Sequence, residues 1–165
     1  MKITPNQLSD NIFEMISDRW MLITAGDRRK ANTMTASFGG FGVLFFKNVA
    51  HIYVRPERYT YEFLEKKDTF SLSFFSPEFK SKLAYCGKAS GRDEDKIAKC
   101  GFHVLYDADE TPYFDEAQIT VLCKKLYRQD ISRDCFTDST AFEKTYSSGG
   151  MHRMYIGEIT DIIKR

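Results

Sequence analysis

Several features that would place the chain in a special class of protein are missing from its 165 residues. No apolar run approaches the ~20 residues that span a bilayer, and residues 1–13 contain neither the apolar segment nor the small-residue cleavage site of a secretory signal. Positive and negative charges nearly cancel, with 24 Lys and Arg against 23 Asp and Glu, so no large basic field attracts nucleic acid or anionic lipid. We therefore expect a cytoplasmic protein that binds neither membrane nor nucleic acid.

The cysteines lack the spacing of a metal site. They form no C-x-x-C pair, and no histidine stands at the distance typical of a zinc site, so we expect no bound metal. Two disulfides are arithmetically possible, but a chain of this length can bury a core without them. We expect reduced, buried thiols that pack as small hydrophobic groups, at Cys86, Cys100, Cys123 and Cys135.

Nothing in the sequence divides the chain into parts. It has no internal repeat, low-complexity tract or linker rich in Pro, Gly or Ser, so we expect a single domain over residues 1–165. Aromatic residues make up 15% of the chain, and such flat side chains either fill a core or wall a site for a flat ligand. Strand-like segments dominate, at residues 20–25, 32–37, 49–54, 69–75, 117–127 and 152–163.

These segments predict a mainly β domain with peripheral helices. Phe70, Leu72 and Phe74 alternate with Ser71 and Ser73, so the two sets are expected on opposite faces of one strand. Long strands without regular helices between them are typical of an antiparallel sheet or barrel. We therefore expect an antiparallel sheet or barrel as the centre of the fold.

Two of the expected helices have clear start and stop signals. Ser76 and Pro77 provide an N-cap and a first-turn proline, and Gly87 would end the helix that follows. The sequence SGRD at residues 90–93 resembles a capping box and precedes a second helix, which Gly101 would end. Both helices are expected to lie outside the sheet.

Residues 55–60, with the sequence RPERYT, have the outline of a phosphate site. The proline stops the preceding strand, and a helix over residues 60–67 is expected to follow. The guanidinium groups of Arg55 and Arg58 match the geometry of a phosphate, and the N–H groups of a helix start add further donors. Surface pairing of either arginine with a nearby glutamate explains the same residues, so spacing alone leaves both interpretations open.

Residues 32–37, with the sequence NTMTAS, form a second candidate segment. Its small hydrogen-bonding side chains would let a strand backbone run beside a heteroaromatic ring and present N–H and C=O groups to the ring edge. The glycines that follow in residues 38–42 would then let the chain turn away. The alternative is a polar edge strand that leads into a glycine loop.

Together and in this order, these segments resemble the flavin reductase-like FMN-binding split-barrel family, and most closely its flavoredoxin-like branch. No single segment is decisive, because each is short, but together they cover most of the chain in the order of the family. They are WMLITAG (20–26), NTMTASFGG (32–40), VRPERYTYEFL (54–64), FSLSFF (70–75), SGRDEDK (90–96) and HRMYIGEI (152–159).

The resemblance implies a six-stranded Greek-key split barrel with FMN lying across it, and usually a homodimer partner that helps to enclose the site. Two of the residues that the resemblance assigns to the cofactor also have a structural explanation, which is a helix cap for Ser90 and an exposed helix charge for Lys96. The residues implied to bind the cofactor are Asn32, Thr33, Met34, Thr35, Ala36 and Ser37 along the ring and ribityl chain, Arg55, Arg58, Tyr59 and Thr60 on the phosphate side, and Ser90 and Lys96 in a further motif.

His152 is the candidate catalytic residue that the resemblance implies. Many reductases of the family begin their last long strand with Gly-Asp-His, near the point where a nicotinamide enters. This chain has Gly150-Met151-His152, without the aspartate. The departure puts in doubt both a positioned imidazole and the use of NADH or NADPH, and an ordinary barrel histidine is the alternative.

The resemblance favours an NAD(P)H-dependent flavin reductase-like oxidoreductase that passes electrons through bound FMN to a second acceptor. A flavin carries this chemistry itself, so no nucleophile or acid–base pair is required of the protein. The first alternative keeps FMN but makes the protein an electron carrier that docks to redox partner proteins. The second is a barrel-shaped binding module without flavin.

Overall fold

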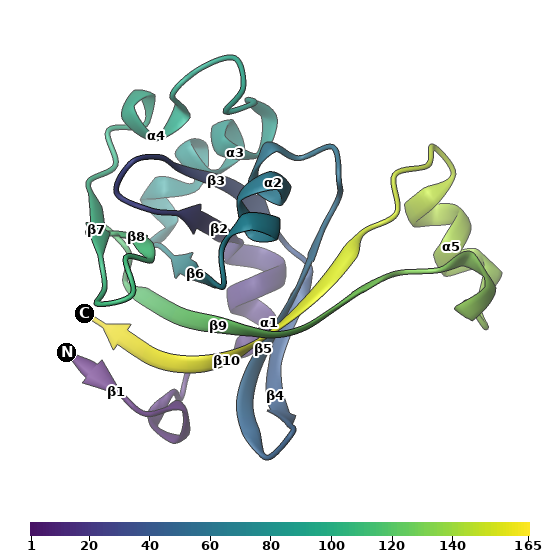
Figure 1. Ribbon diagram of the computed structural model, residues 1–165, viewed down its shortest axis with the longest axis horizontal. Helices are drawn as coiled ribbons and strands as arrows, with labels where there is room; N and C mark the ends of the chain where they lie inside the picture. The colour runs from purple at the N-terminus through teal and green to yellow at the C-terminus, as the bar shows by residue number, and fades with distance from the viewer.

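The computed structural model describes residues 1–165 and has one curled antiparallel sheet at its centre (Figure 1). Seven of its eight strands follow the order β3-β2-β6-β9-β10-β5-β4, and β1 pairs with β10. The sheet is barrel-like but split, since β3 and β4 lie at the two ends of this path. Its strands are β1 (Lys2–Ile3), β2 (Met21–Gly26), β3 (Ala31–Ala36), β4 (Gly39–Leu44), β5 (Lys47–Val54), β6 (Thr69–Phe74), β9 (Ile119–Asp130) and β10 (Arg153–Lys164).

Short elements surround this sheet. A small separate hairpin pairs β7 with β8. Figure 1 shows that β9 and β10 extend together beyond the rest of the sheet, and the segment that joins them carries α5. We call residues 131–152 the arm. The surrounding elements are α1 (Ile12–Glu14), α2 (Tyr59–Lys66), α3 (Lys80–Lys88), α4 (Lys96–Lys99), β7 (Val104–Tyr106), β8 (Pro112–Phe114) and α5 (Ser139–Tyr146).

None of these helices combines the length and the apolar character that crossing a membrane requires.

The predicted alternation in β6 places its phenylalanine and leucine side chains on one face of the sheet and its serine side chains on the other. Phe70, Leu72 and Phe74 are fully buried in the larger cluster, inside the curl of the sheet. Ser71 and Ser73 are also buried on the other face, where the hydroxyl of Ser71 donates to the carbonyl oxygen of Pro112 at 2.6 Å. Burying a large apolar side chain contributes ~1.5–3 kcal/mol, and a slip by one residue would exchange the two faces. The alternation therefore fixes the register of β6 in the middle of the sheet.

All six predicted strands are present, and the mainly β, split-barrel prediction is confirmed. The strands correspond to β2, β3, β5, β6, β9 and β10, with ends shifted by at most three residues. The expected glycine loop at residues 38–42 is instead the start of β4, which pairs with β5. A Cβ atom on Gly40 would lie 2.5 Å from Nε2 of His51, so a larger residue there would displace the imidazole. The hairpin turns through Phe45 and Phe46, which have φ values of 54° and 60°.

The helix that starts after Ser76 is longer than predicted. A single turn over Pro77–Phe79 leads into α3, which passes through Gly87 and ends at Lys88. Gly87 therefore does not end the helix. A Cβ atom at this position would lie 3.2 Å from Cβ of Thr35, so the glycine lets α3 approach β3 closely.

The predicted capping box at residues 90–93 is wrong. These residues form a turn, and α4 begins only at Lys96. Asp95 caps α4 instead, because its carboxylate accepts a hydrogen bond from the backbone N–H of Ala98 at 3.0 Å. Gly101 has a φ of 64° and ends the helix as predicted.

The cysteines agree with the expectation of free, buried thiols at three of the four positions. Cys86, Cys100 and Cys123 are buried and unpaired, and burial raises the pKa of the Cys86 thiol to about 12. Cys135 is exposed because it lies in the arm, outside both cores. The prediction of burial is therefore wrong for Cys135 alone.

Candidate functional site

A cavity of about 240 Å³ brings together the two segments that the sequence singles out. One wall is the end of β3 and the residues after it, and the opposite wall contains the end of β5 and the start of α2. The third side is formed by the residue that precedes β10. The lining residues are Met34, Thr35, Ala36, Ser37, Phe38, Tyr53, Arg55, Arg58 and His152.

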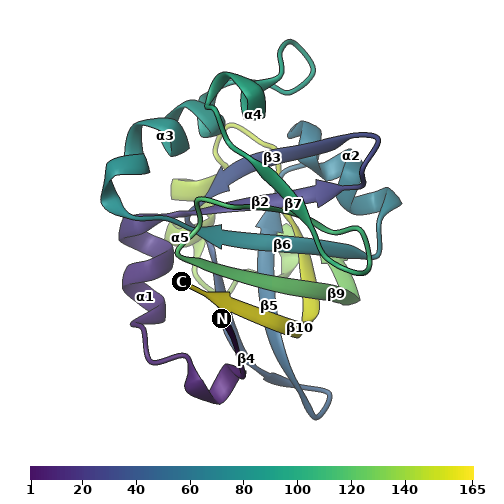
Figure 2. The same ribbon diagram turned by 90° about the vertical axis from the view of Figure 1, so that its left-hand side faces the viewer.

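The strand β3 has one free edge beside this cavity. It pairs only with β2, and Figure 2 shows it at the border of the sheet with α3 and α2 close by. A second hollow, of about 380 Å³, lies between the end of β3 and α3 and shares Thr35, Ala36 and Ser37 with the first. An edge strand presents unpaired backbone N–H and C=O groups. The end of β3 therefore offers hydrogen-bonding groups to a flat ligand.

The polar side chains in the first half of β3 are bonded within the protein. The amide of Asn32 donates to the hydroxyl of Thr60 at 2.8 Å, and the hydroxyl of Thr33 donates to the carbonyl oxygen of Ile23 at 3.1 Å. The hydroxyl of Thr35 donates to the carbonyl oxygen of Leu83. These bonds fix β3 against α2, β2 and α3. Four of the six predicted residues, Met34 to Ser37, line the cavity, whereas Asn32 and Thr33 do not.

Arg58 carries a buried positive charge that is only partly satisfied. Its Nη1 donates to the carbonyl oxygen of Gly87 at 2.8 Å, but its buried Nη2 has no hydrogen-bond partner. Burial lowers the pKa of the guanidinium. A buried donor on a charged group costs free energy unless a partner reaches it, so the position is suited to an anion.

Lys96 places a second buried cation near Arg58. Its Nζ donates to the carbonyl oxygens of Cys86 and Ala89, at 2.8 and 2.9 Å, at the end of α3. Burial lowers the pKa of Lys96 to about 8, and the positive charge of Arg58 acts in the same direction. Lys96 is only 3% exposed, so the alternative of an exposed helix charge is excluded.

The other residues predicted on the phosphate side have partners of their own. Arg55 lines the cavity, but its Nη1 and Nη2 donate to the carbonyl oxygens of Gly149 and Thr145, at 3.2 and 3.0 Å. Arg55 therefore holds the end of α5. The hydroxyl of Tyr59 accepts a hydrogen bond from Lys30 at 2.9 Å, and the hydroxyl of Ser90 accepts one from the backbone N–H of Arg92 at 3.2 Å.

A larger hollow, of about 600 Å³, is lined by two further predicted residues. Asn32 and Lys96 line it together with Gly91, where a Cβ atom would lie 1.9 Å from Oδ1 of Asn32. Tyr59, Thr60 and Ser90 line neither this hollow nor the smaller cavity. The structure thus gathers most of the predicted residues around β3 but distributes them over adjoining hollows.

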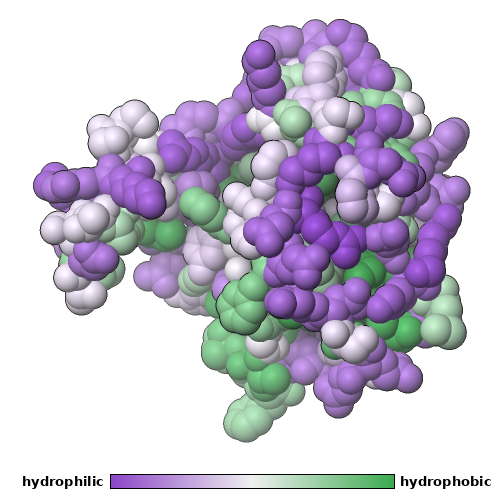
Figure 3. All heavy atoms as spheres, turned by 180° about the vertical axis from the view of Figure 1, so that it is seen from behind, coloured by the Kyte–Doolittle hydropathy of each residue, from purple (hydrophilic) through white to green (hydrophobic).

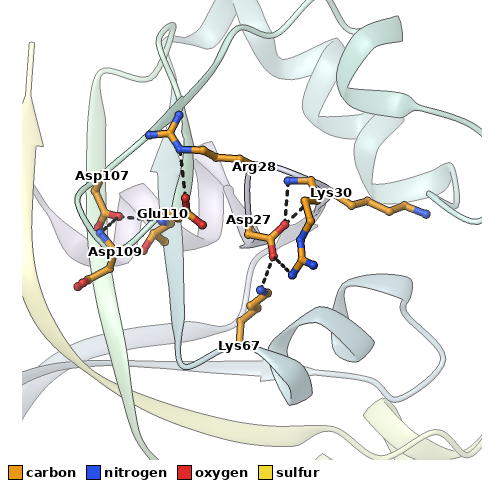
Figure 4. A network of polar contacts seen from close by, with 9 residues as sticks. Asp27, Arg28, Lys30, Lys67, Asp107, Asp109 and Glu110 are labelled. Atoms are coloured by element: carbon orange, nitrogen blue, oxygen red, sulfur yellow. Dashed lines mark hydrogen bonds and ion pairs between the residues drawn. The ribbon is translucent and has the colours of Figure 1, made fainter.

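The turn between β2 and β3 is fixed by a charged network that Figure 4 shows from close by. Asp27 accepts hydrogen bonds from the backbone N–H groups of Arg29 and Lys30, at 2.9 and 3.2 Å, and its carboxylate also pairs with Lys67 and the Arg29 side chain. The Lys67 and Arg29 contacts hold the pKa of Asp27 well below its usual range. The network fixes the turn from which Lys30 reaches Tyr59.

His152 contacts a residue that sequence reasoning missed. Its Nδ1 lies 2.8 Å from the hydroxyl of Tyr146, at the end of α5. Burial lowers the pKa of His152, the charge of Arg55 lowers it further, and Glu57 opposes both. The sequence did contain a signal for α5, because the carboxylate of Asp138 caps it as an aspartate before a helix typically does.

Comparison with known proteins is consistent with this arrangement. The sequence matches the flavin reductase-like domain family over residues 14–165. The chain belongs to this family. Membership associates the protein with flavin-related redox chemistry, and it agrees with the resemblance noted in the sequence. A comparison with curated proteins gives no match.

Solved structures with the same fold include two flavoredoxins and an oxidoreductase. Flavoredoxin from Methanosarcina acetivorans is 22% identical, with a TM-score of 0.69, covering 100% of this chain and 75% of the other. Flavoredoxin of Desulfovibrio vulgaris (Miyazaki F) is 20% identical, with a TM-score of 0.70 and coverages of 99% and 77%. An NADH:FAD oxidoreductase from Streptomyces globisporus C-1027 is 14% identical, with a TM-score of 0.64 and coverages of 88% and 75%. At these identities the likeness shows the fold alone.

Proposed function

We propose that this protein binds FMN and acts as an NAD(P)H-dependent flavin reductase-like oxidoreductase that passes electrons to a second acceptor. The observation that carries the proposal is the half-buried Arg58, whose buried Nη2 lacks a partner beside the cavity. Family membership and the names of the similar structures, which include flavoredoxins and an NADH:FAD oxidoreductase, add support.

The residues around β3 fit the chemical parts of FMN. Lys96 is a buried cation and Arg58 a half-buried one, and neither forms an ion pair within the chain, so a phosphate would compensate both charges. In this proposal, residues 32–37 lie along the ring and ribityl chain, and Ser90 and the segment 55–60 lie on the phosphate side. Arg55 acts there through its charge, because two of its nitrogens already bind backbone carbonyls.

The protein's own contribution is binding, orientation and exclusion of water. Bound FMN supplies a ring that accepts a hydride or single electrons. The free edge of β3 presents backbone N–H groups, which would stabilise negative charge on such a ring. Phe38 and Met34 line the cavity and keep part of it apolar. His152 faces the same cavity, and we assign it the contact with the substrate.

An FMN-dependent electron carrier is the second candidate function. Two observations favour it: the similar structures include two flavoredoxins, and Met151 stands where many family reductases have an aspartate before the histidine. In this case partner proteins, and no nicotinamide, would deliver the electrons.

We also propose a cytoplasmic homodimer. The hairpin between β4 and β5 carries apolar side chains in solvent, with Val43 75% exposed, Phe45 55% exposed and Phe46 fully exposed. Figure 3 shows apolar side chains gathered at one end of the molecule. Such a patch on a protein surface commonly marks an association site, and sedimentation of the purified protein tests the proposal.

An absorption spectrum tests the two candidate functions together. The purified protein is loaded with FMN and mixed without oxygen with NADH, with NADPH, or with a reduced redox protein. Bleaching by a nicotinamide supports the oxidoreductase, whereas bleaching only by the protein donor supports the carrier. A protein that stays colourless and takes up no FMN would contradict both functions and favour a binding module without flavin.

A further inference from the structure

Tyr146 and His152 form a buried pair that the proposed contacts with FMN do not use. Tyr146 ends α5 and is 6% exposed, and His152 directly precedes β10 and is 9% exposed. The imidazole ring contacts the rings of Tyr146 and Phe38, each with a centroid distance of 5.6 Å. These two contacts restrict the orientation of the imidazole at the wall of the cavity.

Two directions are possible for the hydrogen bond between Tyr146 and His152, and donation by the hydroxyl group satisfies the buried groups better. The two atoms lie 2.8 Å apart, and the hydroxyl has no other hydrogen-bond partner in the chain. If the imidazole donated instead, the buried hydroxyl proton would lack an acceptor, which costs ~1–3 kcal/mol. Nδ1 is therefore the acceptor, and the neutral imidazole carries its proton on Nε2.

The surroundings of His152 favour the neutral imidazole. Burial lowers its pKa, Arg55 lowers it further, and Glu57 raises it by less. The other ionisable groups that line the cavity are Arg58 and Tyr53, and burial raises the pKa of the Tyr53 phenol, so it stays uncharged. Nε2 makes no hydrogen bond within the chain. It is therefore an uncharged donor that remains free for a ligand.

We infer that Tyr146 is a positioning residue that fixes His152 as a neutral Nε2–H donor for a carbonyl oxygen of the substrate. An uncharged donor suits the oxygen of an amide or ketone, whereas a carboxylate gains more from a cation. The inference rests on the proposed function, since the carbonyl group belongs to a molecule that exchanges electrons with the bound flavin. The carboxamide of a nicotinamide and the carbonyl group of an acceptor share this chemistry.

The position of the proton on His152 is measured directly by NMR of the ¹⁵N-labelled protein without flavin. We expect the neutral ring of the wild type to be protonated on Nε2, and we expect Tyr146→Phe to yield a mixture of both tautomers. The imidazole signals of His152 are identified as those that are absent from the spectrum of the His152→Gln variant. A proton on Nδ1 in the wild type, or the same single tautomer in Tyr146→Phe, overturns the inference. If Tyr146→Phe does not fold, the wild-type spectrum decides alone.

Kinetics separate this inference from the proposed function. We expect Tyr146→Phe to bind FMN within about twofold of the wild type, but to lower kcat/KM by about five- to fiftyfold, because its imidazole donor is no longer fixed. NADH as donor and a ketone as acceptor are varied separately, so that the affected step identifies the source of the carbonyl group. Tyr85→Phe is the matched control, since its hydroxyl bonds to Glu94 outside the cavity.

The outcomes of the two experiments are distinct. Unchanged kcat/KM in a Tyr146→Phe protein that binds and reduces FMN overturns the inference alone. A wild type that binds no FMN overturns the proposed function, while the NMR result still decides the tautomer. If FMN binds but neither nicotinamide nor ketone reacts, the NMR measurement also decides.

Discussion

The two sides of the candidate site are built in different ways. Arg58 and Lys96 meet at the end of α3, where backbone carbonyls accept their hydrogen bonds. Tyr146 and His152 belong to the arm and its junction with β10, which Figure 1 shows projecting beyond the sheet. One side is thus part of the packed body of the protein, and the other is carried by an extension.

This difference separates two tasks. The charges of Arg58 and Lys96 are held by many contacts in the packed part of the protein. Such charges are suited to a cofactor that all members of a family bind. Side chains on an extension change without rebuilding the core, so they are suited to the part of the site that selects the substrate. We therefore expect substitutions at the α3 end to alter cofactor affinity, and substitutions in the arm to alter turnover.

Replacing Arg58 is expected to give the largest effect. In Arg58→Ala, the lost charged hydrogen bonds should weaken FMN binding by about ten- to a hundredfold, or about 1.5–3 kcal/mol. Quenching of FMN fluorescence during titration measures this affinity. Arg133→Ala, at an exposed arginine of the arm, is the matched control. Equal affinities for Arg58→Ala and wild type would remove the distinction between the two sides.

The pH dependence of FMN binding sharpens the role of Lys96. Its pKa is lowered to about 8, mainly by burial, so the ammonium group loses its proton as the pH rises through this value. Affinity for the phosphate should then fall by about three- to tenfold between pH 7 and pH 9. In Lys96→Gln the binding should be weaker at pH 7 and nearly independent of pH. A wild type whose affinity is flat over this range contradicts the assignment.

Replacing Asp27 tests how much the turn between β2 and β3 contributes to the stability of the packed part of the protein. In Asp27→Asn we expect a lower midpoint of thermal unfolding, because the pairing with Lys67 and Arg29 is lost. The pKa of Asp27 is lowered in the folded protein, so its stabilising contribution is present above the unfolded pKa of ~3.9 and disappears as the pH falls below it. The difference in midpoint between wild type and variant should therefore shrink in acid. A difference that grows in acid would contradict this reading.

Replacing Cys123 is expected to have the smallest effect on the site. The thiol is buried and burial raises its pKa, so it is an inert packing group. Cys123→Ala, and equally Cys86→Ala, should leave FMN affinity within about twofold of the wild type and flavin reduction intact. Loss of reduction in a variant that still folds and binds FMN would give the cysteines a redox role.

The strands were predictable because their signals are local. Phe70, Leu72 and Phe74 needed only their own alternation to fix β6. In β4 the glycines hid the strand, because they have little intrinsic preference for extended structure. The strand forms by pairing with β5, where Gly40 lies opposite His51. The side chain of His51 occupies the space beside Gly40. This contact between distant residues has no signature in the sequence of β4.

The candidate site was predictable in its segments and less so in its contacts. The family resemblance marked Arg55 and Arg58 alike, but only Arg58 has a buried nitrogen without a partner, whereas Nη1 and Nη2 of Arg55 donate to backbone carbonyls at the end of α5. Lys96 was left undecided because burial of a lysine depends on how α3 and α4 pack. Tyr146 was missed because its role depends on a hydrogen bond to His152, which only the folded structure shows.

The open edge of β3 has a consequence for solubility. An unpaired edge strand is a template onto which another chain can add, and proteins usually cover or interrupt such an edge. Here α2 and α3 lie against β3, and the bond from Thr35 to Leu83 ties its side chain to a helix. The stretch that stays accessible is the part lining the cavities. A ligand seated there would also cover the last accessible part of the edge, so the purified protein should aggregate more readily without the ligand than with it.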